Sequence, residues 1–316
     1  MMRRFDRPED RPVLLALRAL KLGDLLVAVP ALHGLRRAFG GHELVLAVSG
    51  WLEQIVELVD GIDALLPTPG LDEPLPVPPG AVDVAANLHG NGPESRALID
   101  ALRPRRRIAH RSPGNPDGPE WVDGMHERVR WARLVTAHGA PADPDDVRIR
   151  VPSREPHVEG AAVVHVGAFY GARQWPVERF AAVARALRGD GARVVVTGGA
   201  SDRARAEALA ERAGIPGADV RAGRSDLADL AALIAHAGVV VSADTGAAHL
   251  ASAYGTPSVV IFGPAPASEW GPPPGPHLVL TDEARRRGDV FADDPDPALL
   301  AITSEDVIRA ARAVQR

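Results

Sequence analysis

The feature that constrains this chain most is a regular alternation of short, β-branched apolar runs with helical patterns. In the first half the predicted strands are Val13–Leu17, Glu43–Val48, Val82–Ala86 and Arg107–His110. The predicted helices are Leu25–Phe39, Leu52–Val59, Glu94–Arg103 and His126–His138. Since apolar strands that alternate with helices are typical of parallel sheets, the sequence predicts an α/β fold.

The alternation restarts after a segment rich in proline and acidic residues, Gly139–Gly160, which we interpret as a linker. Beyond it the predicted strands are "AAVVHVG", "ARVVVTGG", "VVVSADTG" and "PSVVIFGP". Helical patterns cover residues 176–188, 203–213, 225–238 and 247–255. We therefore predict two doubly wound, Rossmann-like domains, residues 1–150 and 151–316, that face a central cleft. The last helix could pack back on the first domain.

Composition excludes several classes of protein. A net charge of −5 and a pI near 6.1 argue against a nucleic-acid binder, which would carry a basic face. The chain has no cysteine, which excludes disulfides, zinc–thiolate sites and cysteine nucleophiles. The N-terminal segment lacks the apolar region of a signal peptide, and no apolar run approaches the ~18 residues of a membrane span. A cytoplasmic, monomeric protein is expected.

Ligands of open α/β sheets bind beyond the carboxyl ends of the strands, so the strand-to-helix turns are where chemistry is expected. The first such turn, Lys21-Leu22-Gly23-Asp24, places one carboxylate at the mouth of a helix. Asp24 could simply cap the helix, which would contribute about 0.3–1 kcal/mol. It could instead be a general base that takes a proton from an attacking hydroxyl.

The second half has two turns that suit an anion. "GAFYGARQWP" joins a glycine, Gly167, to Arg173, which could pair with a phosphate, although a solvated arginine is an equally good interpretation. Gly198 and Gly199 allow close backbone approach to a ligand, but any tight turn uses glycine in this way. The predicted helix over residues 225–238 has Ser225 or Asp226 as its cap. Its start, with Ser225 and Leu227, is a further candidate loop on the nucleotide side.

The most specific turn is "SADTGAAHLASAYGTP", in which Asp244, Thr245 and Gly246 follow a strand and open a helix. Free N–H groups at a helix N-terminus favour a diphosphate, and Thr245 adds a hydroxyl donor. Asp244 would repel a phosphate and is better suited to accept hydrogen bonds from sugar hydroxyls. His249, about one turn into the helix, could turn its ring toward a phosphate or could be a structural histidine.

Two acidic loops and one basic run each have a functional and a structural interpretation. The acidic loops "DPDD" and "DDPDP" could be proposed as metal sites, but both are broken by proline and are interpreted as solvated segments, so no metal is expected. The basic run Arg103–Arg111 is a candidate for contact with an anionic acceptor or a membrane surface, or is a solvated face. No G-x-G-x-x-G follows the first strand, which argues against a dinucleotide-dependent oxidoreductase.

Taken together, "LGDLLVAVPALHGLRRAF", "ARQWPVERFAAVARAL", "VVVTGG" and "VVVSADTGAAHLASAYGTPSVVIFGP" resemble glycosyltransferase family 9, the heptosyltransferase type. The resemblance covers Val13 to about Pro273. It implies a GT-B fold, with the donor in the C-terminal half and the acceptor in the N-terminal half. It also implies inverting transfer from a nucleotide sugar, ADP-heptose in most members, to a saccharide-type acceptor, without a metal or other cofactor.

The resemblance assigns residues by position. Asp24 matches the catalytic base, and Arg173 matches a basic residue at the donor phosphates. Asp244, Thr245, Gly246 and His249 match the D-T-G-x-x-H donor motif. Four residues of the first half are further candidates for the acceptor side, with less weight: Gly23, His89, Asn91 and Arg107.

One departure leaves the donor sugar open. Where the family reads G-P-T-D-P, this chain has "GPAPAS", which lacks the Thr and Asp near the donor. Two alternatives therefore remain: a nucleotide-sugar 2-epimerase of the same fold, and a non-catalytic nucleotide-sugar-binding module. Retention of Asp24 beside the donor motif argues against the binding module, because donor binding alone does not require a base.

Overall fold

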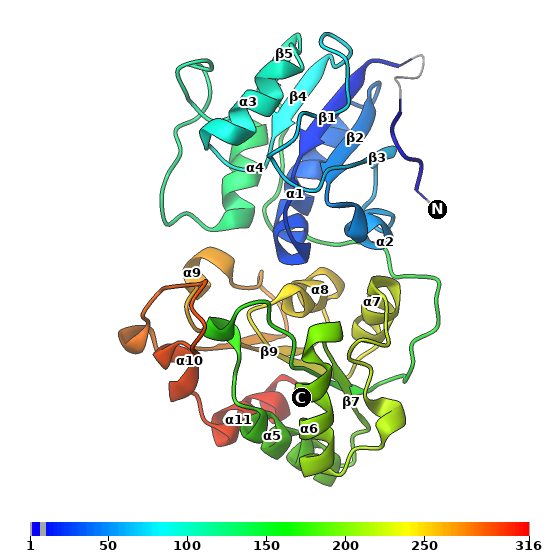
Figure 1. Cartoon of the computed structure of the whole chain (residues 1–316), viewed down its shortest axis with the longest axis vertical. Coiled ribbons are helices and arrows are strands. Elements are labelled where there is room, and N and C mark those ends of the chain that lie inside the picture. The colour runs from blue at the N-terminus through cyan, green and yellow to red at the C-terminus, as the bar shows by residue number, and fades with distance from the viewer. Residues whose placement is uncertain (1, 7–10, 316) are drawn as a thin grey trace. The chain divides into compact units, whose positions relative to one another are not determined.

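The computed structural model describes residues 2–6 and 11–315 of the chain. These form two compact units, Met1–Arg150 and Val151–Arg316, each built on its own five-stranded parallel sheet (Figure 1). The predicted α/β class with two Rossmann-like halves is therefore confirmed. The cleft stays a prediction.

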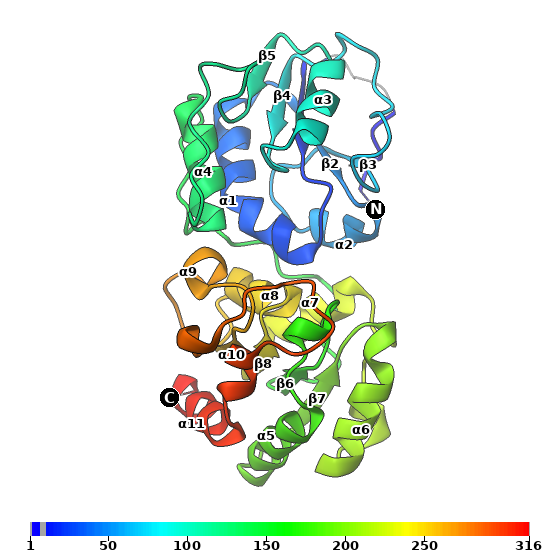
Figure 2. The ribbon, with the colours of Figure 1, turned by 60° about the vertical axis from the view of Figure 1, so that its left-hand side comes forward.

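The first unit has the strand order β3-β2-β1-β4-β5. Its strands are β1 (Val13–Leu17), β2 (Glu43–Val48), β3 (Ala64–Pro67), β4 (Val84–Asn87) and β5 (Arg106–Ile108). Its helices are α1 (Leu22–Ala38), α2 (Glu53–Val56), α3 (Pro93–Ala101) and α4 (Glu127–Ala137). Helices α1 and α4 pack side by side, and α3 covers the other face of the sheet (Figure 2). Both faces are covered, which explains why all five residues of β1 are apolar and buried.

The chain reverses its direction of strand addition between β1 and β4, which are hydrogen-bonded neighbours. In doubly wound sheets this reversal is the topological switch point, where the loops at the carboxyl ends of the strands separate and leave room for a ligand. The turns after β1 and β4 are therefore the part of this unit best placed to bind a substrate.

The second unit has the strand order β10-β9-β8-β6-β7, and a single bridge between Val196 and Val220 extends it beyond β7. Its strands are β6 (Ala162–His165), β7 (Val194–Thr197), β8 (Val239–Ala243), β9 (Ser258–Ile261) and β10 (His277–Leu280). Its helices are α5 (Val177–Gly189), α6 (Arg203–Ala213), α7 (Leu227–Ala235), α8 (Gly246–Tyr254), α9 (Ala267–Trp270), α10 (Pro297–Ala301) and α11 (Ser304–Val314). Helices α5, α6 and α11 pack on one face, and α7 and α8 lie together on the other (Figures 1 and 2). Its switch point lies between β6 and β8.

Several predicted boundaries were wrong. Helix α1 begins at Leu22 rather than Leu25, because the extended residue Lys21 precedes it and donates its N–H to the side chain of Asp24. The predicted helix Leu52–Val59 is a 3₁₀ turn, Gly50–Leu52, followed by the one-turn helix α2.

Strands β3 and β10 were missed, because each has four residues and neither shows a long β-branched run. The last helix, α11, for which packing against the first domain was considered, lies against α5 and the β8–β10 side of the second sheet.

Candidate active site

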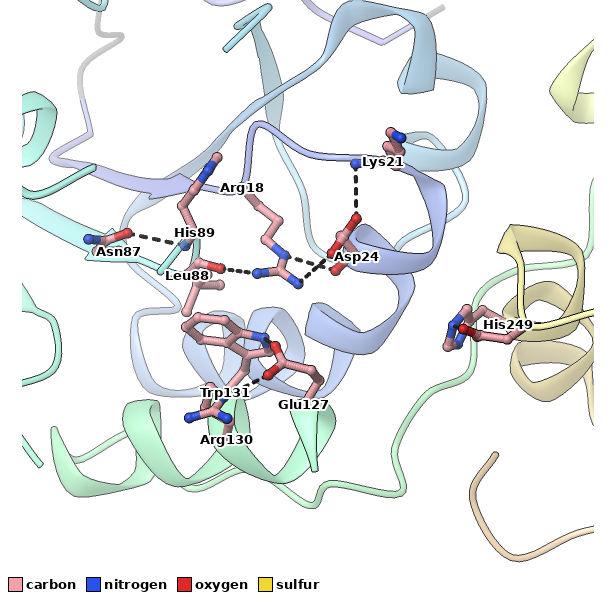
Figure 3. A network of polar contacts seen from close by, with 11 residues as sticks. Arg18, Lys21, Asp24, Asn87, Leu88, His89, Glu127, Arg130, Trp131 and His249 are labelled. Carbon is pink, nitrogen blue, oxygen red and sulfur yellow. Dashed lines mark hydrogen bonds and ion pairs between the residues drawn. The ribbon is translucent and has the colours of Figure 1, made fainter. Parts of the chain in front are cut away.

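Asp24 is the third residue of α1, just beyond the carboxyl end of β1. Its Oδ2 accepts a hydrogen bond from the N–H of Lys21 at 3.2 Å, and its Oδ1 lies 3.6 Å from Nη2 of Arg18 (Figure 3). The side chain of Asp24 is 24% exposed, whereas that of Arg18 is 1% exposed. Asp24 therefore caps α1 and also presents a partly exposed carboxylate, so the two interpretations of this residue are compatible.

His89 follows β4, which pairs with β1, so the switch point brings it to the same end of the sheet as Asp24 and Gly23. The backbone N–H of His89 donates to Oδ1 of Asn87 at 3.1 Å (Figure 3). Burial, with the nearby positive charge of Arg18, lowers the pKa of His89 to about 4. His89 is therefore neutral at pH 7 and could exchange a hydrogen bond with a hydroxyl.

The remaining acceptor-side candidates lie farther along this sheet. Arg107 belongs to the edge strand β5, two strands from β1, and Asn91 donates to the carbonyl of Arg111 at 3.3 Å. Three arginines of the basic run Arg103–Arg111 are engaged by carboxylates: Arg105 with Asp83, Arg107 with Asp100 and Arg111 with Glu120, at 3.0, 2.9 and 2.9 Å. These pairs reduce the positive charge that the run can offer to an anionic surface.

In the second unit, Arg173 and Asp244 meet across the switch point between β6 and β8. Nη1 of Arg173 donates to Oδ2 of Asp244 at 2.9 Å and to the Asp244 carbonyl at 3.2 Å. The Asp244 side chain is 5% exposed and that of Arg173 is 27% exposed. From sequence, Arg173 and Asp244 were assigned separate partners, a phosphate and a sugar. In the structure Asp244 also orients the guanidinium of Arg173.

The rest of the D-T-G-x-x-H motif surrounds this pair. Thr245 is the N-cap of α8, and its buried Oγ1 has no hydrogen-bond partner among the described residues. Gly246 is the first residue of the helix, and Nε2 of His249 lies 3.8 Å from Oδ1 of Asp244. An unsatisfied hydroxyl beside the free N–H groups of a helix N-terminus is a suitable place for an anionic ligand.

The two glycine turns pack against each other beside β6 and β7. A Cβ at Gly167 would lie 2.6 Å from Nε2 of His165 and 2.9 Å from Oδ2 of Asp202, so a larger residue there would displace these side chains. Gly199 donates its N–H to Oδ2 of Asp202 at 2.8 Å, and a Cβ at Gly198 would lie 2.9 Å from Cβ of Asp202. The three glycines therefore let the backbone of both turns lie close to Asp202.

Of the two predicted caps of α7, the structure selects Asp226 over Ser225. Asp226 is the N-cap, and its side chain accepts from the N–H of Asp229 at 2.8 Å. Ser225 instead receives a hydrogen bond from Nε of Arg221 at 3.2 Å, and Leu227 is the first residue of the helix. Neither Ser225 nor Leu227 follows a β-strand directly.

Two charged or titratable side chains next to these turns were missed from sequence. Arg18 ends the run "LLALR" and is buried beside Asp24. His165 ends β6, and its Nδ1 lies 2.9 Å from Oγ1 of Thr197. Burial lowers the pKa of His165 to about 4, so its ring is neutral at pH 7. For both residues the available signal was a charged or titratable side chain at the end of an apolar strand.

The described residues form neither a metal site nor a membrane-spanning helix. Within residues 2–6 and 11–315, no three or more His, Cys, Asp or Glu side chains are grouped as a metal site. In the same part of the chain, no helix is long and apolar enough to cross a bilayer.

Comparison with known proteins relates part of the chain to a family. Residues 138–281, a little under half of the chain, match the model of glycosyltransferase family 9 (heptosyltransferase). A segment of 100 residues is 34% identical to lipopolysaccharide heptosyltransferase 3 of Escherichia coli and spans 31% of this chain and 29% of that relative.

Solved structures show the fold of the whole chain. A family 9 glycosyltransferase from Veillonella parvula has a TM-score of 0.75 at 19% identity and covers 97% of both chains. ADP-heptose lipopolysaccharide heptosyltransferase II of E. coli has a TM-score of 0.74 at 18% identity, over 96% of this chain and 98% of that one. The dodecameric, iron-containing heptosyltransferase TibC, in complex with ADP-D-β-D-heptose, has a TM-score of 0.65 at 17% identity, over 98% and 78% of the two chains. The predicted GT-B fold is confirmed.

Proposed function

We propose that the protein is an inverting, metal-independent glycosyltransferase that moves a heptose from ADP-heptose to a hydroxyl of a saccharide acceptor. The observation that carries this proposal is the Arg173–Asp244 pair across the switch point of the family 9 domain, next to the buried, unsatisfied hydroxyl of Thr245. Two proteins of similar structure support the choice of donor: ADP-heptose lipopolysaccharide heptosyltransferase II, and TibC in complex with ADP-D-β-D-heptose.

The second unit would hold the donor. Arg173 and the N-terminal N–H groups of α8 would bind the diphosphate, and Thr245 would add its hydroxyl. His249 would contact the diphosphate from one turn into the helix. Asp244 would accept hydrogen bonds from the sugar while it holds Arg173. Because a guanidinium and a helix N-terminus can together stabilise the charge of a departing diphosphate, the reaction would not need a metal ion.

The first unit would supply the base. As the acceptor oxygen forms its bond to the anomeric carbon, the bond from that carbon to the ADP oxygen breaks. The hydroxyl proton passes to the carboxylate of Asp24, and ADP leaves with the bonding electrons. Attack from the face opposite the leaving group inverts the anomeric centre. A partly exposed carboxylate at a switch point is well placed for this step.

The test is release of ADP from ADP-heptose in the presence of a panel of saccharide acceptors that includes deacylated lipopolysaccharide cores. We expect release that depends on an acceptor and persists in excess EDTA. Conversion of the donor sugar without an acceptor would indicate an epimerase, and tight donor binding without turnover would indicate a binding module. Loss of turnover in EDTA, with recovery on addition of iron or magnesium, would contradict the metal-independent mechanism.

A further inference from the structure

A buried arginine stands behind the proposed base. Arg18 lies between β1 and α1 and is 1% exposed. Its Nε donates to the carbonyl of Asp24 at 2.8 Å, and its Nη1 donates to the carbonyl of Leu88 at 2.6 Å (Figure 3). The indole of Trp131 covers the guanidinium, with 4.7 Å between Cζ and the ring centroid. One side chain therefore ties the first turn of α1 to the turn after β4, across the switch point.

The third nitrogen of this guanidinium faces the carboxylate. Nη2 lies 3.6 Å from Oδ1 of Asp24, beyond hydrogen-bond distance, and within the described structure it has no hydrogen-bond partner. A buried, unsatisfied N–H destabilises the folded protein, so it needs a compensating interaction. The attraction between Nη2 and the Asp24 carboxylate is the compensation that the structure offers.

We propose that Arg18 is a positioning residue for transfer: it fixes the orientation of the Asp24 carboxylate. This inference rests on the proposed role of Asp24. The N–H of Lys21 holds Oδ2, and Arg18 attracts Oδ1 without forming a hydrogen bond to it. Oδ1 therefore keeps a lone pair for the proton of the acceptor hydroxyl.

The other charged groups near Arg18 do not substitute for it. Glu127 of α4 accepts from Nε of Arg130 at 2.7 Å and from Nε1 of Trp131 at 3.0 Å, so its charge is already paired (Figure 3). His89 is neutral at pH 7, because burial lowers its pKa to about 4. Lys21, the only lysine of the chain, is the N-cap residue of α1, and it holds the Asp24 carboxylate through its backbone N–H.

An arginine suits this place better than a lysine would. The planar guanidinium directs Nε and Nη1 to carbonyls of two different turns, while Nη2 faces Asp24. A lysine could keep the positive charge near Asp24, but its single ammonium could not satisfy both carbonyls in this geometry. Charge and orientation can therefore be separated by mutation.

The experiment compares Arg18→Met with Arg130→Met in acceptor-dependent ADP release. Arg130 is a matched control, since it is 3% exposed and packs on Trp121 with 3.9 Å between Cζ and the ring centroid. We expect Arg18→Met to lower kcat about ten- to a hundredfold, with the KM for ADP-heptose within about twofold of the native value. Arg130→Met should lose thermal stability but keep the native kcat and the native KM for ADP-heptose.

A second variant keeps the test decisive if Arg18→Met does not fold. Arg18→Lys retains a positive charge but cannot satisfy the carbonyls of both Asp24 and Leu88, so its kcat should stay reduced while the KM for ADP-heptose stays native.

Native kcat in Arg18→Met, or equal losses of kcat in Arg18→Met and Arg130→Met, would overturn the inference. So would an Arg18→Lys protein with native kcat. Failure of the proposed function would look different: Asp24→Asn would keep native turnover, or no acceptor would stimulate ADP release by the native protein. Either result would refute the inference as well.

Discussion

Arg173 should be required for nucleotide binding in a way that an equivalent arginine elsewhere in the same unit is not. We consider Arg173→Met, which keeps much of the aliphatic stem and removes the guanidinium. If Arg173 binds the diphosphate, the variant loses a charge-assisted hydrogen bond worth about 1.5–3 kcal/mol, so ADP should bind about ten- to a hundredfold more weakly. Isothermal titration of ADP into the purified protein measures this directly.

The same substitution should also lower stability, because Asp244 loses its ion-pair partner while only 5% of its side chain is exposed. Removal of one member of a buried pair costs about 3–5 kcal/mol, and an exposed pair contributes less than about 1 kcal/mol. Arg173 is 27% exposed and His249 lies 3.8 Å from Asp244, so an intermediate loss of about 2 kcal/mol is expected. Urea denaturation of both proteins tests this value.

Arg193→Met is the matched control. Nη2 of Arg193 pairs with Oδ1 of Asp219 at 2.7 Å, and Asp219 is likewise 5% exposed. Arg193 directly precedes β7, so this pair lies at the amino end of the sheet, opposite the end that carries Arg173. Arg193→Met should lose stability and retain native ADP affinity. Equal weakening of ADP by both variants, or a Kd for Arg173→Met within twofold of native, would refute the assignment of Arg173.

Two further predictions concern the same unit. Asp244→Asn should weaken ADP-heptose more than ADP in parallel titrations, because the lost acceptor is assigned to the sugar; equal loss for both ligands would mean that Asp244 acts only through Arg173. Because the pKa of His165 is lowered to about 4 by burial, the folded protein keeps it neutral while the unfolded chain gains a proton below its pKa of about 6.5. The free energy of unfolding should therefore fall by about 2 kcal/mol more between pH 7 and pH 5 in the native protein than in His165→Asn. An equal fall in the native protein and in His165→Asn would contradict the assignment.

The sequence was sufficient to locate the turns but not the contacts between them. Asp24 and Asp244 each follow a long, β-branched or apolar run, and such runs end where a ligand site begins. The pairing of Arg173 with Asp244 could not be predicted, since the residues are 71 positions apart and meet only because β6 and β8 are neighbours in the sheet. Strand order is a property of the whole domain, so local patterns do not contain it.

Arg18 was missed for a related reason. In the run "LLALRAL" the arginine looks like the end of a strand, and an arginine at a strand end is usually solvated. Its burial depends on Trp131 and on the carbonyl of Leu88, which belong to distant parts of the chain. Strands β3 and β10 escaped prediction because "ALLP" and "HLVL" contain at most one β-branched residue each and border on proline-rich segments.

The central claim is that Asp24 is the base of a sugar transfer, and one variant tests it most directly. Asp24→Asn keeps an oxygen that can accept the hydrogen bond from the N–H of Lys21, so α1 should remain capped and the protein folded. The measurement is acceptor-dependent ADP release from ADP-heptose, alongside the Kd for ADP. Our account predicts a fall in turnover of about 10²–10⁴-fold with an unchanged ADP Kd. Native turnover in Asp24→Asn would contradict it and would leave Asp24 as a helix cap alone.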